Sequence, residues 1–90
     1  MTFEQFISKC LVSMENKIPK DKIYFQYTYC PDMPAVANSY KCQVKGTQHK
    51  IYITPGEEVC QYYDKDNNFE NLDSLNACID RFIKDVKVND

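Results

Sequence analysis

The spacing of the apolar residues changes twice along this chain. From Phe3 to Met14 they recur every three or four residues, as on one side of a helix, and a second such stripe runs from Leu72 to Val86. Between the two stripes, apolar and polar residues alternate, as in strands with one buried face. This order predicts a helix, a group of strands and a second helix.

The first helix is expected over residues 1–16. Thr2 and Gln5 have the spacing of a capping box, in which each side chain binds a backbone N–H group of the first turn. Pro19 cannot continue a helix, because it lacks the N–H group and its ring clashes with the preceding turn.

The second helix is expected over residues 68–86, with Asn67 and Glu70 as its capping box. Residues 87–90 are expected to form a frayed tail.

Four strands are expected between residues 22 and 63. Short turns join the last three, which predicts antiparallel neighbours. A loop with two prolines follows the first strand, over residues 31–38. The predicted fold class is a single-domain α+β two-layer sandwich of order α-β-β-β-β-α, with both helices packed on a four-stranded antiparallel sheet. The expected strands span residues 22–30, 40–45, 49–54 and 58–63.

Composition excludes several kinds of site. Of the 90 residues, 43% are hydrophobic and 27% charged, which is typical of a globular protein. The two glycines, Gly46 and Gly56, are too few for a glycine-rich phosphate loop, and the single histidine, His49, excludes a site with two imidazoles. We expect no catalytic residue, no metal site and no cofactor.

Five cysteines occur, at positions 10, 30, 42, 60 and 78. The odd number argues against a disulfide framework, and none of the short spacings of a zinc site is present. No signal peptide and no apolar run long enough to cross a membrane is seen. We therefore expect a cytoplasmic, reducing environment with no membrane contact. Cys10, Cys42 and Cys78 are expected in the core, and Cys30 and Cys60 are the candidates for reactive thiols.

Charge is distributed unevenly. Residues 17–56 carry six lysines against two acids, a net charge of +4, whereas residues 57–90 carry nine acids against four bases, a net charge of −5. Such asymmetry points to a partner more clearly than the total of −2 does.

The uncovered face of the sheet is the candidate binding site. If both helices cover one face, the other exposes lysines and tyrosines, with Thr54 at the end of the third expected strand. Lysines can neutralise phosphates, and tyrosine rings can stack on bases. A solvated sheet face, a protein interface and a dimer interface remain alternatives. The candidate RNA- or phosphate-binding residues are Lys22, Tyr24, Lys41, Lys45, Lys50 and Tyr52.

Other polar residues have ordinary structural interpretations. His49 is expected to be a half-exposed strand residue, since no spacing implies a catalytic partner. The acidic residues after the fourth strand lack the glycine and the bidentate glutamate of an EF-hand, so they predict a solvated loop. These residues are Asp64, Asp66, Glu70 and Asp73.

The order of elements resembles the proteins that bind the Alu domain of the signal recognition particle. The smaller of that pair opens with an aromatic, acidic helix followed by a P-x-K-[IV]-x-x-K-Y strand. Its last strand often reads V-C-x-x-Y-x-x-D, and the larger subunit has a K-C-x-x-[RK]-x-T segment. The similar segments here are Thr2-Phe-Glu-Gln-Phe6, Pro19-Lys-Asp-Lys-Ile-Tyr-Phe-Gln-Tyr27, Val59-Cys-Gln-Tyr-Tyr-Asp-Lys-Asp66 and Lys41-Cys-Gln-Val-Lys-Gly-Thr47.

That family has three strands and is usually basic, so the four strands and net negative charge expected here depart from it. The resemblance implies a heterodimer whose joined sheet holds the backbone of a structured RNA. It points to Lys22, Lys41, Lys45 and Lys50.

A second resemblance is to Src-homology-2 domains, whose helices lie on opposite faces of the sheet. Ile23-Tyr-Phe-Gln-Tyr-Thr28 and Phe69-Glu-Asn-Leu-Asp-Ser-Leu75 look like two of their motifs. Gln26 stands where the phosphate-binding arginine belongs, and an amide cannot replace a guanidinium there. This resemblance implies a degenerate protein-interaction module.

The expected function is therefore a non-catalytic binding module. A structured RNA, contacted through its phosphate backbone, is the first expected partner, in a hetero- or homodimer through the open sheet face. The alternative is a protein–protein interaction module, either Src-homology-2-like or a small acidic inhibitor of a larger complex.

Overall fold

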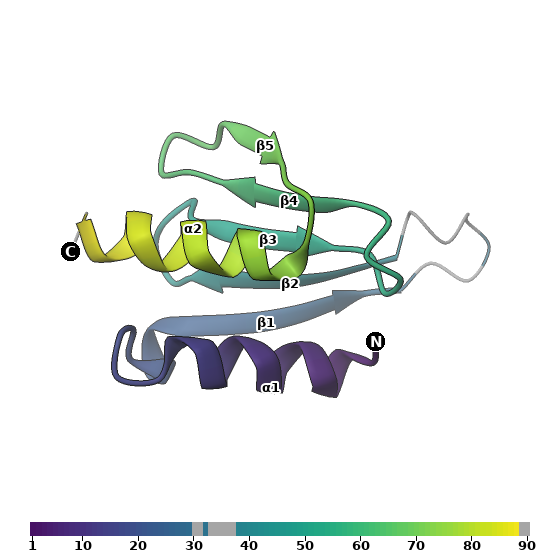
Figure 1. Ribbon diagram of the computed structural model, residues 1–90, viewed down its shortest axis with the longest axis horizontal. Coiled ribbons are helices and arrows are strands. Elements are labelled where there is room, and N and C mark those ends of the chain that lie inside the picture. Colours follow the sequence, from purple (N-terminus) through teal and green to yellow (C-terminus); the bar gives the residue numbers. More distant parts are fainter. Residues whose placement is uncertain (30–31, 33–37, 89–90) are drawn as a thin grey trace.

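The computed structural model describes residues 1–29, 32 and 38–88 of the chain. The chain forms a single α+β domain (Figure 1). In the order of the sequence, one helix precedes the antiparallel sheet and the other follows it, which confirms the predicted fold class. The sheet has five strands, one more than predicted. The elements are α1 (Phe3–Met14), the 3-10 turn η1 (Lys20–Lys22), β1 (Ile23–Thr28), β2 (Ser39–Val44), β3 (Lys50–Ile53), β4 (Cys60–Tyr63), β5 (Phe69–Asn71) and α2 (Leu75–Val88).

The capping box predicted for α1 is confirmed. Thr2 Oγ1 accepts from the Gln5 backbone N–H at 3.1 Å, and Gln5 Oε1 accepts from the Thr2 backbone N–H at 2.8 Å. The helix ends at Met14, two residues earlier than expected. Asn16 then adopts a left-handed conformation with φ of 63°, which turns the chain toward Pro19 and β1.

All five strands pair with their sequence neighbours, in the order β1-β2-β3-β4-β5. The register places Tyr40 opposite Ile53, and Ile53 opposite Cys60. Because neighbouring side chains in a strand point to opposite faces, these residues share one face with Cys42, Ile51 and Tyr62. All of them are buried, so this face forms the sheet side of the core.

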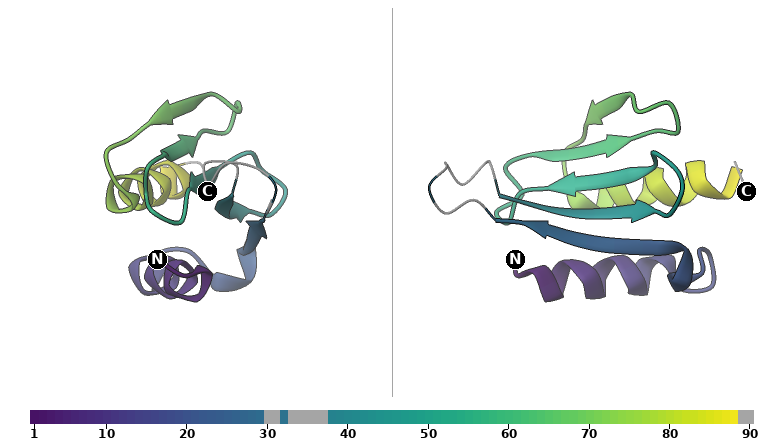
Figure 2. Two further views of the ribbon diagram at one scale, coloured as in Figure 1. Left: turned by 90° about the vertical axis from the view of Figure 1, so that its right-hand side faces the viewer. Right: turned by 180° about the vertical axis from the view of Figure 1, so that it is seen from behind.

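Both helices cover that same face. From α1, the ring of Phe6 lies 5.6 Å from the ring of Tyr40. From α2, Asp85 accepts a 2.9 Å hydrogen bond from the hydroxyl of Tyr62. In the view from behind, the strands lie in front of α2 (Figure 2). Neither helix covers the opposite face of the sheet, which is the open face among the described residues.

The helix predicted over residues 68–86 begins later than expected, at Leu75, and its predicted cap is wrong. Asn67 has a left-handed φ of 65° in a tight turn, where the Asp64 carboxylate accepts backbone N–H groups of Asp66 and Asn68. That turn returns the chain as β5. Ser74 caps α2 instead, its hydroxyl accepting from the Ala77 N–H at 3.2 Å.

The C-terminal end of the second helix also differs from its prediction. Helix α2 continues to Val88, two residues beyond its predicted end. Residues 89–90, Cys30 and most of the loop predicted at 31–38 lie outside the described residues. Among the described helices, none is long and apolar enough to cross a membrane.

Four cysteines are free and buried in the core: Cys10, Cys42, Cys60 and Cys78. Hydrogen bonding with the Cys10 side chain of α1, and then burial, raise the pKa of the Cys42 thiol on β2. Burial also raises the pKa of Cys60. A raised pKa leaves little thiolate at Cys42 and Cys60, so these two thiols act as small apolar groups, and Cys60 does not fit the role of a reactive thiol.

The Thr2→Ala substitution should lower the free energy of unfolding by about 1 kcal/mol, because one N–H group of the first turn loses its acceptor. Chemical denaturation measures the change. Ser8→Ala is the matched control on the exposed side of α1 and should be neutral or slightly stabilising, since alanine favours helix. Equal stability of wild type and Thr2→Ala would show that the capping box contributes nothing to the free energy of unfolding.

Candidate functional site

The side chains of the open face form two rows that cross the sheet. Cross-strand pairing aligns Tyr24, Gln43, Lys50, Tyr63 and Phe69 in the first row. The second row, in the same order of strands, contains Gln26, Lys41, Tyr52, Gln61 and Asn71. The two rows together contain four aromatic rings, two lysines and no acid.

Lys41 lies beside the β1 end of the rows. Its Nζ is 5.2 Å from the centre of the Tyr24 ring, a cation–π contact. The Tyr24 hydroxyl donates to Gln43 Oε1 at 2.5 Å, and Gln43 Nε2 donates to the backbone carbonyl of Thr47 at 2.8 Å. Tyr24 and Gln43 are thus held in one orientation while the Tyr24 ring stays 37% exposed.

Lys50 occupies the centre of the first row. Its Nζ lies 4.9 Å from the centre of the Tyr63 ring and donates to Asn67 Oδ1 at 3.0 Å and Gln48 Oε1 at 3.2 Å. Partial burial, and then the positive charge of Lys41, lower the pKa of Lys50. The two ammonium groups repel one another, so an anion between them would stabilise both.

Three rings meet toward the other end of the face. Tyr52 and Tyr63 are 5.4 Å apart at 69°, and Phe69 lies 5.6 Å from Tyr63. A hollow of about 270 Å³ opens beside this corner. It is lined by Ser39, Tyr52, Gln61 and Tyr63 with parts of three neighbouring residues, Ile53, Thr54 and Val59.

The predicted site residues fall into two groups. Tyr24, Lys41, Lys50 and Tyr52 all lie on the open face, as the alternation predicts. Lys22 and Lys45 lie just outside it, exposed at the start of β1 and the end of β2, where the Lys45 N–H donates to the Lys22 carbonyl at 2.8 Å.

Thr54 does not belong to the open surface as expected. It is 3% exposed, because its hydroxyl caps the turn before β4, accepting from the Val59 N–H and donating to Glu58. Sequence reasoning also missed Gln61, Tyr63 and Phe69. The alternation of Gln61 and Tyr63 with the buried Cys60 and Tyr62 was the available signal for the first two, whereas Phe69 depended on the unpredicted strand β5.

His49 is buried rather than half-exposed as predicted, at 4% exposure. Its Nδ1 lies 3.1 Å from the hydroxyl oxygen of Tyr62, which donates its one proton to Asp85. His49 Nδ1 must therefore carry a proton and donate to Tyr62. Arg81 continues the chain of contacts, with ion pairs to Asp85 at 3.3 Å and to Glu70 of β5 at 2.9 Å.

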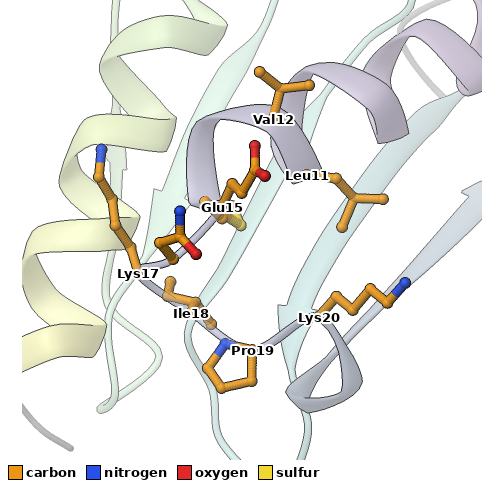
Figure 3. Close-up of a pocket in the computed structure, with 9 residues that line it drawn as sticks. Leu11, Val12, Glu15, Lys17, Ile18, Pro19 and Lys20 are labelled. Carbon is orange, nitrogen blue, oxygen red and sulfur yellow. The ribbon is translucent and has the colours of Figure 1, made fainter.

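A larger cavity, of about 680 Å³, lies at the C-terminal end of α1 and not on the open face. Lys17 and Lys20 extend away from one another on either side of Ile18 and Pro19 (Figure 3). The described side chains that line it include no histidine, cysteine or serine, and its ionisable groups are Glu15, Lys17 and Lys20, all exposed. The rest of the lining is largely apolar.

The acidic residues after β4 do not gather around one point. Glu70 pairs with Arg81, and Asp64 binds backbone N–H groups of its own turn, which lowers its pKa. Within residues 1–29, 32 and 38–88, no cluster of three histidine, cysteine or acidic side chains could hold a metal ion.

The Tyr62→Phe variant tests the buried network. Burial, and then the hydrogen bond to Asp85, raise the pKa of Tyr62 far above its ordinary value. An unfolded tyrosine loses its proton near pH 10 while the folded one keeps it, so this group's contribution to stability is present below about pH 10 and is lost as the pH rises further. Wild type should thus lose up to about 1.4 kcal/mol per pH unit more than Tyr62→Phe in that range.

At neutral pH the same variant should be less stable by about 1–3 kcal/mol, because His49 and Asp85 lose a buried partner. Denaturant unfolding at neutral and alkaline pH measures both effects. Tyr29→Phe removes an exposed hydroxyl and should leave the alkaline loss as it is in wild type. Parallel curves for wild type and Tyr62→Phe would contradict this interpretation.

Comparison of the chain with protein-family models, curated proteins and solved structures found no match. The function is therefore argued from the open face itself, where lysines and aromatic rings are held together without an acid.

Proposed function

We propose that this chain is a non-catalytic RNA-binding module that contacts the phosphate backbone of a structured RNA through its open face. The observation that carries the proposal is the arrangement of Lys41 and Lys50, each held over a tyrosine ring on a face without acids. Lys22 and Lys45, exposed at one end of that face, extend its positive charge.

Electrostatics supports an anionic partner at this face despite the net charge of −2. Among the described acids of the C-terminal part, Glu70 faces Arg81, and Asp64 binds backbone N–H groups in the β4–β5 turn. Burial, and then repulsion by Lys41, lower the pKa of Lys50, and a phosphate placed near both ammonium groups would relieve the repulsion. Local charge, rather than the total, decides such an encounter.

The layer arrangement supports the same proposal. Two helices on one face and an open second face agree with the resemblance to Alu-domain-binding subunits, whereas a Src-homology-2 domain has its helices on opposite faces. The five strands are a departure from the three of that family. Helix α2 is a poor candidate for an acidic inhibitor surface, because Arg81 and Lys84 offset Asp80 and Asp85 among its described side chains.

A protein partner is the second candidate. Tyr24, Tyr52, Tyr63 and Phe69 give the open face the aromatic character of an interface core, where charged residues are few. A second copy of the chain, seated face to face, would bring Lys41 and Lys50 close to their counterparts. That juxtaposition of like charges favours the RNA over a homodimer.

A salt titration tests the proposal. Binding of a labelled structured RNA, followed by fluorescence anisotropy, should weaken with a slope of log K against log salt of roughly −2 to −4, because two to four lysines displace counterions. Lys41→Glu should reduce the affinity at least about tenfold and flatten the slope by about one unit.

Lys9→Glu on α1 is the matched control, since it changes the net charge equally but lies on an exposed helix surface. It should leave the slope unchanged. Equal losses in both variants would indicate a response to net charge alone, and no binding at low salt would refute the proposal.

A further inference from the structure

The hollow beside Tyr52 and Tyr63 indicates a second kind of contact with the RNA, in addition to phosphate binding by the lysines. We infer that it holds one unpaired base of the bound RNA, stacked on the tyrosine corner while the flanking phosphates lie at Lys41 and Lys50. This inference rests on the proposed function and narrows its substrate to RNA with an unpaired nucleotide, such as a loop or a bulge.

The geometry of the corner suits a planar ring. Tyr52 and Tyr63 stand at 69° to one another with their centres 5.4 Å apart, so one ring can offer its face where the other offers its edge. Aromatic rings prefer these two arrangements over a direct sandwich. The Phe69 ring of β5 packs against the Tyr63 ring of β4, on the side of β4 opposite β3.

The size of the hollow limits its occupant. Its volume of about 270 Å³ is just below the range of roughly 300–1,000 Å³ typical of small-molecule sites. One base fits such a volume, whereas a base pair in a helix cannot enter, because its faces are covered by its stacked neighbours. RNA-binding sheets commonly read bases that are splayed out in this way.

Polar groups around the hollow could bind the edge of a base. Gln61 forms its wall and is oriented by Asn71 Oδ1, which accepts from Gln61 Nε2 at 3.1 Å, and by the Tyr63 hydroxyl at 3.4 Å. Ser39 adds a hydroxyl from β2. An amide has both a donor and an acceptor, the combination that the edge of a base requires.

The lysines stand on the two sides of the corner. Lys41 is the cross-strand partner of Tyr52, and Lys50 is the cross-strand partner of Tyr63. The Lys50 ammonium lies 4.9 Å from the centre of the Tyr63 ring, whereas the Lys41 ammonium extends toward Tyr24 on β1. A base at the corner would thus have one cation beside it and a second toward β1, where the backbone of the same RNA continues.

Two RNA probes of equal length test the inference: a hairpin with an unpaired loop and a fully paired duplex. Anisotropy at about 50 mM salt, where phosphate contacts are strong, should show tighter binding of the hairpin by roughly tenfold. Tyr52→Ala should lower the affinity for the hairpin to the affinity for the duplex. Tyr52→Phe should keep the preference, because it retains the ring.

The chain supplies its own optical readout, since it has seven tyrosines and no tryptophan. The hairpin should quench tyrosine emission more than the duplex does, and the extra quenching should disappear in Tyr52→Leu. Tyr29→Ala is the matched control: Tyr29 is 61% exposed, contacts the Tyr27 ring and does not line the hollow. Should Tyr52→Ala fail to fold, Tyr52→Leu keeps the bulk without the ring and replaces it in the affinity measurement.

Equal affinity for hairpin and duplex, unchanged in the Tyr52 variants but weakened in Lys41→Glu, would overturn the inference and leave the proposed function standing. Failure of both probes to bind would overturn both. Preference for the hairpin that survives loss of the Tyr52 ring would also overturn the inference, since the base would then lie elsewhere.

Discussion

The burial of one face of the sheet under both helices is the constraint on which the rest of this structure depends. Tyr40, Cys42, Ile51 and Tyr62 come from three different strands, yet all point toward α1 and α2 and are almost fully buried. A one-residue slip in any strand would exchange its buried residues for the polar ones of the open face. The register of the whole meander, and so the two rows of the open face, follows from this burial.

Polar contacts join the sheet to α2 in addition to the apolar packing of the core. Tyr62 is the largest fully buried side chain, and its hydroxyl reaches His49 on one side and Asp85 on the other. Arg81 then joins Asp85 to Glu70, so that α2 is tied both to the centre of the sheet and to the short edge strand β5. Without that connection, an edge strand of only three residues such as β5 would be weakly held to the sheet.

The open face is polar but ordered. Tyr24, Gln43, Lys50 and Gln61 are each fixed by hydrogen bonds or ring contacts to neighbours on the same face. Side chains that are already oriented lose less conformational entropy when a ligand binds. Such a face differs from a merely solvated sheet surface, although its composition of lysines, amides and tyrosines is similar.

The sequence by itself determined the class of fold and most of the open face. The spacing from Phe3 to Met14, the Thr2–Gln5 box and the alternation of Tyr40, Cys42 and Val44 are local signals, and each is confirmed because backbone geometry alone sets these periods. The same alternation placed Tyr24, Lys41, Lys50 and Tyr52 on one surface. Only the tertiary structure decided the fifth strand, because Phe69–Asn71 fall within the helix predicted from residue 68 and form a strand by pairing with β4. It also decided the burial of His49 and Thr54 and the closeness of Tyr52 to Tyr63, because these depend on residues that meet across strands and not along the chain.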